Sequence, residues 1–350
     1  MGIDGQRAVP LTAIGDEHFE GTVAQVSAGE LYAYQLNEGS ARPDPRSLSQ
    51  PLGVHRPSAV VWPEEFCWSD QNWRGIPQSQ LVLYEFHVGT FTRDGNFDSA
   101  IERLAELVDL GVTAIEVMPV ASFPGRRGWG YDGVALYAVH ESYGGTSAFQ
   151  RFIDACHRHG LAVILDMVYN HLGPEGNYLR EFGPYFTERH HTPWGAAVNY
   201  DGTDAGPVRR FVTDNVRQWI HDFHIDGLRL DAIQTIIDDS EETIVAEIAR
   251  IAREEAASLG RPIHIIGETD QNDAKLITPV EEGGWGLTAV WSDDFHHAVH
   301  AYLTGERGGY YADFGQPQQI AKALRENFVF DGISSQFREG YTGTKCHHLT

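Results

Sequence analysis

The stretch Gly227-Leu-Arg-Leu-Asp231 decides the fold that we expect for this chain. Successive side chains of a β-strand point to opposite faces, so the two leucines share one face while Arg229 and Asp231 share the other. The leucines predict packing beneath helices, and the polar pair predicts a site at the C-terminal end of the strand. A neighbouring guanidinium keeps a carboxylate ionised, which makes Asp231 a candidate nucleophile. A purely structural ion pair is the alternative interpretation.

This stretch belongs to a pattern of alternating strands and helices that starts at residue 81. The predicted strands are 81–91, 112–119, 161–169, 226–231, 264–268 and 287–291. The predicted helices, which carry apolar residues at helical spacing, are 96–110, 147–159 with Ser147 as its N-cap, 207–223, 241–258 and 318–327. The alternation implies parallel pairing, and polar residues gather where the strands end. Both features are typical of an α/β protein with a (β/α)8 barrel.

The barrel is expected to be incomplete, because about six strands are recognisable where a closed barrel of this type has eight. We therefore predict a catalytic barrel over residues 79–350 that lacks its last strands. Residues 1–78 lack helical periodicity, and the alternating runs 19–27 and 31–37 predict part of an N-terminal β-sandwich and its linker. The expected chain is thus truncated at both ends, and the origin of the truncation is open.

The composition argues against several classes of partner. Acidic residues outnumber basic ones by 49 to 26, and the net charge of −23 disfavours binding to nucleic acids and anionic membranes. The three cysteines have no paired spacing, which fits a reducing compartment. There is no apolar run of membrane-spanning length and no recognisable signal peptide. We expect a soluble cytoplasmic protein without a cofactor; the sequence does not indicate its oligomeric state.

Two carboxylic acids, Asp231 and Glu268, close consecutive predicted strands. Neighbouring strands lie about 5 Å apart, so the two carboxyl groups are expected about 5–5.5 Å apart, as in retaining glycosidases. Glu268 follows an isoleucine-rich strand that favours its protonated form, whereas Arg229 favours the ionised form of Asp231. Asp231 is therefore the predicted nucleophile and Glu268 the predicted proton donor. A barrel-mouth carboxylate without a chemical role is the alternative interpretation of Glu268.

The third predicted strand ends in Asp166, Asn170 and His171. His171 is a candidate for hydrogen bonding to a sugar hydroxyl, whereas Asp166 and Asn170 are equally well interpreted as braces for loops. Tyr131 and Asp132 lie on a glycine-rich loop, where an aromatic ring such as that of Tyr131 favours stacking on sugars. The alternative is that the aromatic side chains of this loop plug the barrel rim. Trp129, Trp194 and Trp285 are further aromatic candidates.

The run Asp293–His297 is interpreted as the end of the sixth strand. A strand sends His296 and His297 to opposite faces, which disfavours joint metal ligation and favours sugar binding by one of them. No residue spacing in the chain enforces a metal site, so none is predicted, although a metal-dependent barrel enzyme is kept as an alternative.

Three motifs occur in order on successive predicted strands: Asp166–His171, Gly227–Asp231 and Glu268. Together they resemble conserved regions of the α-amylase family of glycoside hydrolases. Longer segments are similar to one branch of it, the malto-oligosyltrehalose trehalohydrolase family; these segments are 84–91, 116–120, 123–133, 170–178, 182–186, 291–297 and 303–306.

This resemblance implies a retaining enzyme that cleaves the α-1,4 bond next to the terminal trehalose unit of a maltooligosyltrehalose, with Asp231 as nucleophile and Glu268 as proton donor. The substrate-binding residues that it implies are Tyr131, Asp132, His171, Arg229, Leu230, Ala232, Ile233, Gln234, Asp293, Asp294, Phe295, His296 and His297.

Three departures from the family pattern are visible. The N-terminal domain is expected to lack the early strands that the family has, and the C-terminal domain of the family is expected to be missing. The fourth region of the family, an Asn-His-Asp motif on the seventh strand, does not occur among the 350 residues, and Gln234 stands where His is expected. We therefore expect this chain to be inactive, or nearly so, by itself. A branching or debranching enzyme of the same family and a non-catalytic glucan-binding remnant are the alternative functions.

Overall fold

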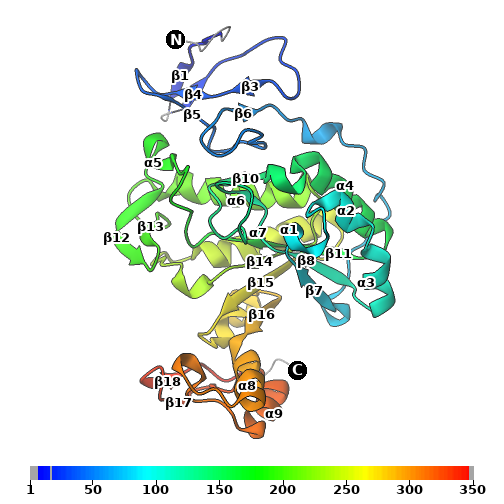
Figure 1. Ribbon diagram of the computed structural model, residues 1–350. Coiled ribbons are helices and arrows are strands. Elements are labelled where there is room, and N and C mark those ends of the chain that lie inside the picture. The colour runs from blue at the N-terminus through cyan, green and yellow to red at the C-terminus, as the bar shows by residue number, and fades with distance from the viewer. Residues whose placement is uncertain (1–6, 16–17, 347–350) are drawn as a thin grey trace.

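The computed structural model describes residues 7–15 and 18–346, and a six-stranded parallel sheet forms its centre (Figure 1). The strands are β7 (Leu83–Phe86), β8 (Ala114–Val117), β11 (Ala162–Met167), β14 (Gly227–Leu230), β15 (His264–Thr269) and β16 (Ala289–Ser292). Their spatial order is β16-β15-β14-β11-β8-β7, and every neighbouring pair is parallel. The predicted incomplete (β/α) barrel is confirmed. Within the described residues, the outer strands β7 and β16 do not pair with each other.

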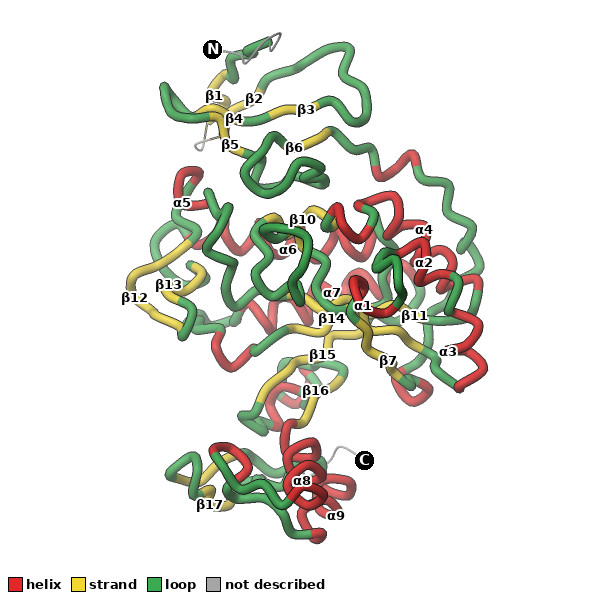
Figure 2. The backbone as a smooth tube through the Cα atoms, viewed as in Figure 1, coloured by secondary structure: helices red, strands yellow, loops and turns green. Residues whose placement is uncertain are grey.

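Helices follow the strands as the periodicity predicts (Figure 2). They are α1 (Val88–Phe91), α2 (Phe97–Ile101), α3 (Leu104–Leu110), α4 (Gly145–Arg158), α5 (Leu179–Phe182), α6 (Ala205–His221), α7 (Ile244–Leu259), α8 (Asp293–Thr304) and α9 (Pro317–Glu326). The apolar residues of the longer helices pack with those of the sheet in one large hydrophobic core, where Phe149, Phe152 and Trp219 are fully buried. This burial is the main favourable term that holds the helices on the sheet.

The other regular elements are short 3-10 helices and two-stranded ladders. The 3-10 helices are η1 (Pro63–Glu65), η2 (Gln78–Gln80), η3 (Glu141–Tyr143), η4 (Ile233–Thr235), η5 (Ala274–Leu276), η6 (Val280–Glu282) and η7 (Gly309–Tyr311). The antiparallel ladders are β1 (Thr12–Gly15) with β2 (His18–Glu20), β3 (Leu31–Tyr32) with β6 (Ser58–Ala59), β4 (Tyr34–Gln35) with β5 (Ala41–Arg42), β9 (Ala121–Ser122) with β10 (Ala135–Val139), β12 (Phe186–Thr192) with β13 (Gly195–Val198), and β17 (Ile333–Ser335) with β18 (Gly340–Thr342).

Three sequence predictions about these elements were wrong. The predicted strand 19–27 extends only to Glu20, where β2 ends, and the predicted strand 31–37 is split into β3 and β4, which belong to two separate ladders. Ser147 does not cap its helix: α4 already begins at Gly145, after Gly144 makes the turn with a φ of 105°. The predicted strand 81–91 ends at Phe86, because the chain turns into α1 directly after His87. The division at residue 78 stays a prediction.

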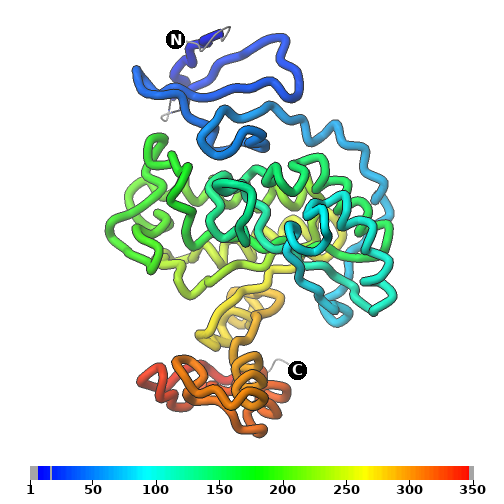
Figure 3. Tube along the Cα trace, viewed as in Figure 1, coloured from blue at the N-terminus to red at the C-terminus, as the bar shows by residue number. Residues whose placement is uncertain are grey.

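The interpretation of the run 293–297 as a strand end was also wrong, because this run forms the first turn and a half of α8. Asp293 and Asp294 lie in that first turn, where carboxylates interact favourably with the helix N-terminus. Helix α8 packs with α9 around a second, smaller core that also contains Phe314, Val329 and Phe330. This body and the N-terminal segment lie on opposite sides of the sheet (Figure 3).

The N-terminal ends of the strands are fastened to the segment before them by Asp226. This fully buried carboxylate accepts hydrogen bonds from Trp73 Nε1 at 2.7 Å, Arg261 Nη1 at 2.7 Å and His157 Nε2 at 3.1 Å, and from the Val163 amide at 2.9 Å. Four donors for one carboxylate offset its loss of hydration. No helix among residues 7–15 and 18–346 is long and apolar enough to cross a membrane.

Replacing Asp226 with Asn is expected to lower the free energy of unfolding by about 3 kcal/mol, because the buried His157 and Arg261 lose their anionic partner. Urea denaturation at pH 7 measures this change. The matched control is Asp109→Asn on the exposed surface of α3, which is expected to shift stability by less than about 0.5 kcal/mol. Equal stability of Asp226→Asn and the parent would contradict the prediction.

Candidate active site

The side chain of Arg229 forms the centre of a polar cluster at the C-terminal end of the sheet. Its Nη1 donates to Asp166 Oδ1 and to Asp231 Oδ1, each at 2.8 Å, and its Nη2 lies 3.7 Å from Glu268 Oε2. The guanidinium is 8% exposed and its central carbon lies 5.3 Å from the centre of the Trp291 ring. The structure thus brings the two predicted catalytic acids, from β14 and β15, to one shared cation.

Strand register explains this convergence. Asp166 on β11 pairs directly with Arg229 on β14. Arg229 in turn pairs with Ile266 on β15, and Glu268 follows two residues later on the same face. The apolar alternation of three neighbouring strands therefore fixes which polar side chains meet.

The two predicted catalytic acids have different surroundings. Asp231 Oδ2 accepts a hydrogen bond from Asn170 Nδ2 at 2.8 Å, in addition to the Arg229 contact. Glu268 Oε2 accepts one from the Ala232 amide at 2.7 Å. Burial raises the pKa of Glu268 above its ordinary value, although Arg229 opposes the shift. The direction of this shift is the one that a general acid requires.

Asp166 is fully buried and both of its oxygens are occupied. Oδ2 accepts a 2.8 Å hydrogen bond from the Tyr131 hydroxyl, and Oδ1 accepts from Arg229. Burial raises the pKa of Asp166 to about 7, while Arg229 acts in the opposite direction. These contacts favour the interpretation of Asp166 as a brace for Arg229. They also join Tyr131, from the glycine-rich loop, to the cluster, whereas Asp132 is exposed.

The residues after Asp231 form a tight turn. Ala232 has a φ of 42° in the left-handed region, and its amide donates to Glu268. Such a conformation costs a non-glycine residue roughly 1–2 kcal/mol, so it is maintained by its surroundings. Leu230 and Ile233 are buried in the main core, and Gln234 Oε1 is buried without a hydrogen-bond partner among the described residues. Leu230 and Ile233 therefore contribute packing.

His171 and Trp194 form the most regular aromatic contact near the site. Their rings stack with centroids 4.5 Å apart and planes at 11°, and His171 Nδ1 also contacts Asn170 Oδ1. Trp194 lies at the turn between β12 and β13 and is 52% exposed. An exposed ring held in this way offers an apolar face to a sugar.

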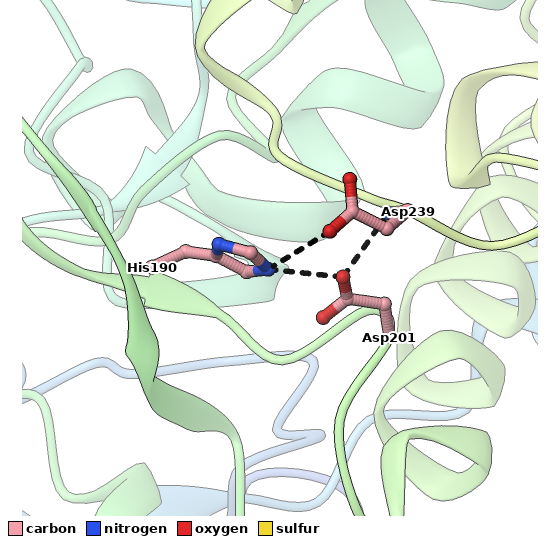
Figure 4. A group of neighbouring side chains, drawn as sticks. All are labelled: His190, Asp201 and Asp239. Carbon is pink, nitrogen blue, oxygen red and sulfur yellow. Dashed lines mark hydrogen bonds and ion pairs between the residues drawn. The ribbon is translucent and has the colours of Figure 1, made fainter.

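An ion-pair cluster ties the β12–β13 hairpin to the loop after β14 (Figure 4). His190 Nε2 lies 3.0 Å from Asp201 Oδ2 and 3.8 Å from Asp239 Oδ2. Arg189 Nη2 lies 3.0 Å from the same Asp239 oxygen, and its Nη1 lies 3.5 Å from Asp201. The spacing of the three groups in Figure 4 also suits a metal ion, but Arg189 already supplies positive charge to both carboxylates. We interpret the cluster as an anchor for the hairpin that carries Trp194.

The predicted run 293–297 is divided by the structure. Asp293 is half-buried and close enough to Glu268 to contribute to its raised pKa. Phe295 and His296 are exposed on α8. Three members of the predicted set are thus open to solvent in whole or in part.

The other two members of the run have internal partners. Asp294 is fully buried, and its Oδ2 accepts hydrogen bonds from Asn272 Nδ2 at 2.7 Å and from two backbone amides, those of Val329 and Phe330. His297 stacks on Tyr310 at 4.7 Å, and burial lowers its pKa to about 4. Both side chains are engaged within the α8–α9 body and are not brought to the Arg229 cluster.

Sequence reasoning missed Glu116, a fully buried acid on β8 that lies near Asp166. The available signal was a single carboxylate inside the otherwise apolar strand Ala114–Val117, which is buried at every position.

Comparisons with known proteins show what the chain is similar to. Residues 60–194 match the family model described as the alpha amylase catalytic domain. A malto-oligosyltrehalose trehalohydrolase of Saccharolobus solfataricus is 48% identical over 332 residues, which cover 95% of this chain and 58% of that protein. The corresponding protein of Arthrobacter ramosus is 50% identical over 312 residues, with 89% and 54% covered.

A solved structure is also similar. The structure, described as a putative alpha amylase from Salmonella typhimurium, superposes with a TM-score of 0.90 at 44% identity and covers 96% of this chain and 57% of its own. Over residues 60–194 the chain thus carries the catalytic-domain pattern of the α-amylase family. Within that family it is similar over nearly all of its length to malto-oligosyltrehalose trehalohydrolases, and it spans slightly more than half the length of these relatives, 58% and 54% in the two cases above.

Replacing Arg229 with Met is expected to lower the free energy of unfolding by about 3–5 kcal/mol, because it leaves the buried Asp166 without its cation. Chemical denaturation at pH 8 measures the loss. Arg210→Met, on the exposed side of α6, serves as the control and is expected to change stability by less than about 0.5 kcal/mol. A small effect of Arg229→Met would show that the cluster does not depend on the guanidinium.

Proposed function

We propose that this chain carries the catalytic site of a retaining glycoside hydrolase that cleaves the α-1,4 bond next to the terminal trehalose unit of a maltooligosyltrehalose and releases trehalose. The observation that supports this most is that Asp231 and Glu268, on neighbouring strands, contact one guanidinium. The substrate is inferred from two relatives that are named malto-oligosyltrehalose trehalohydrolase and that align with 95% and 89% of this chain. Because the proposed reaction releases trehalose, we assign the enzyme to trehalose formation.

The proposed reaction has two steps. A carboxylate oxygen of Asp231 attacks the anomeric carbon of the glucose that precedes the trehalose unit, while Glu268 protonates the departing glycosidic oxygen. Trehalose leaves, and the glucan stays bound to Asp231 as an ester. Glu268, now ionised, removes a proton from water, which attacks the same carbon and releases the glucan with retained configuration.

The structure offers a reason for each role. Arg229 and Asn170 bind one oxygen each of the Asp231 carboxylate and so fix its orientation for attack. The Ala232 amide orients Glu268, and burial favours the protonated form of Glu268 before the first step. Positioned groups of this kind supply much of the rate enhancement of an enzyme.

Two further groups of predicted residues are assigned to the substrate site. Tyr131, Asp132 and His171 belong to the loops around the cluster, and Trp194 extends that aromatic surface through its stacking on His171. In the run 293–297, the exposed members are assigned to direct contact, and Asp294 and His297 act through the loops that they hold.

These 350 residues alone are proposed to turn over slowly. The outer strands β7 and β16 do not pair with each other within the described residues, so the interior of the sheet is not closed. Catalysis depends on exclusion of water and on accurate placement, and a misplacement of about 1 Å costs on the order of 10²-fold.

Incubation with maltotriosyltrehalose tests the function. We expect trehalose and maltotriose as products, and slower cleavage of maltopentaose than of maltotriosyltrehalose. The turnover is expected to be at least about 10²-fold below that of the Saccharolobus solfataricus relative. Chromatography of the products measures both. A fluorinated glucosyl substrate that slows the second step is expected to label Asp231, and Asp231→Asn is expected to stay unlabelled. Transfer to a branch point, or a label on another residue, would contradict the proposal.

Glu268→Gln is expected to reduce hydrolysis of the natural substrate by about 10²–10⁴-fold, since the amide cannot protonate the leaving oxygen. Aryl glycosides with acidic leaving groups need little protonation and are expected to lose much less. In the parent, kcat/KM is expected to fall as pH rises through the raised pKa of Glu268. The exposed Glu254→Gln is the control. Equal losses for both kinds of substrate would exclude the acid role.

A further inference from the structure

Glu116 on β8 is a buried acid that the proposed reaction does not use. Its side chain is fully buried, and neither carboxylate oxygen has a hydrogen-bond partner among the described residues. An ionised carboxylate in such a position is strongly unfavourable, because nothing replaces the water that it lost. Glu116 therefore requires either a bound proton or a bound cation.

Three neighbouring strands bring charged groups to Glu116. Glu85 on β7 pairs with it directly, and Ile164 on β11 is its partner on the other side, so Asp166 follows on the same face. Carboxylate oxygens of Glu85, Glu116 and Asp166 lie within 4.8 Å of one another. Arg229 on β14 is the nearby cation.

The Arg229 guanidinium already interacts with three other carboxylates. Its Nη1 serves both Asp166 and Asp231, and its Nη2 faces Glu268. A further negative charge beside Asp166 would attract the guanidinium toward β8 and β11. The same movement would take it away from Asp231 and Glu268.

We propose that Glu116 is held as a neutral carboxylic acid and is a positioning residue, whose lack of charge keeps the Arg229 guanidinium on Asp231 and Glu268. The consequence for catalysis rests on the proposed function, whereas the protonation state of Glu116 does not. Burial raises the pKa of Glu116 to about 9, with Asp166 acting in the same direction and Arg229 against it. Above that pH the acid ionises and competes for the guanidinium.

Infrared difference spectroscopy of this chain tests the protonation state directly. Glu116→Gln keeps the shape of the side chain and removes the acid. We expect the parent-minus-variant spectrum at pH 7 to contain a carboxylic-acid C=O band that disappears with a midpoint near pH 9. Glu85→Gln, which alters the exposed neighbour, is the matched control and is expected to retain the band. A carboxylate band from Glu116 at pH 7 would overturn the proposal.

Unfolding free energies provide a second test. In the unfolded chain Glu116 ionises in its ordinary range, whereas in the folded chain it keeps its proton to about pH 9. The folded state thus binds more protons between these values, so the parent is expected to lose stability relative to Glu116→Gln as pH rises, until the difference levels off above pH 9. A pH-independent difference would overturn the proposal. So would stabilisation of the parent, but not the variant, by Ca²⁺ or Mg²⁺, which would indicate a cation at Glu116 instead.

The kinetic test uses the ratio of kcat/KM at pH 9 to that at pH 7. This ratio is expected to be higher in Glu116→Gln than in the parent, because the variant cannot ionise beside Asp166. A merely structural role would change kcat/KM by the same factor at both pH values and would overturn the positioning role. If the chain shows no glycosidase activity, the proposed function fails, while the infrared and stability measurements still decide the state of Glu116.

Discussion

The interaction on which the site depends is the sharing of one buried guanidinium by three carboxylates from three consecutive strands of the sheet. Arg229 contacts Asp166 on β11, Asp231 directly after its own strand β14, and Glu268 on β15. Parallel strands bring their C-terminal ends to the same edge, so acids that are far apart in sequence meet there. Like charges at such a distance repel, and the arrangement holds because the cation and raised pKa values reduce that repulsion.

The buried carboxylates at the two ends of the sheet have different surroundings. At the N-terminal end, Asp226 has four donors and holds Trp73 and Arg261 against the strands, so it is a structural group. At the C-terminal end, Glu116 has no partner among the described residues and Asp166 has a pKa near 7. Burial raises the pKa of both acids, so their protonation is open to change, which is a property of reactive sites.

Residue patterns within single segments predicted the strands of the central sheet, because strand formation there follows the local alternation of residues. Strand periodicity located β8, β11, β14, β15 and β16, each within two residues at either end, and thereby the meeting of Asp231 and Glu268. The turn after Ser292 was misjudged because Asp293 and Asp294 suit a helix N-terminus as well as a strand end. Ser147 was misjudged because two glycines allow α4 to begin earlier. The His190 cluster was missed, since its partners come from segments that only the tertiary fold brings together. Glu116 was missed although it is the single carboxylate of a buried apolar strand.

Ion pairs help to hold the aromatic surface that Trp194 and His171 form beside the site. Trp194 stacks on His171, but the hairpin beneath it is tied to the loop after β14 through Asp201, Asp239 and a half-exposed Arg189. Attraction between partly hydrated ions weakens as dissolved electrolyte screens it, whereas ring stacking does not. The ionic strength of the surroundings therefore sets how firmly the indole is presented, independently of the chemistry at the acids.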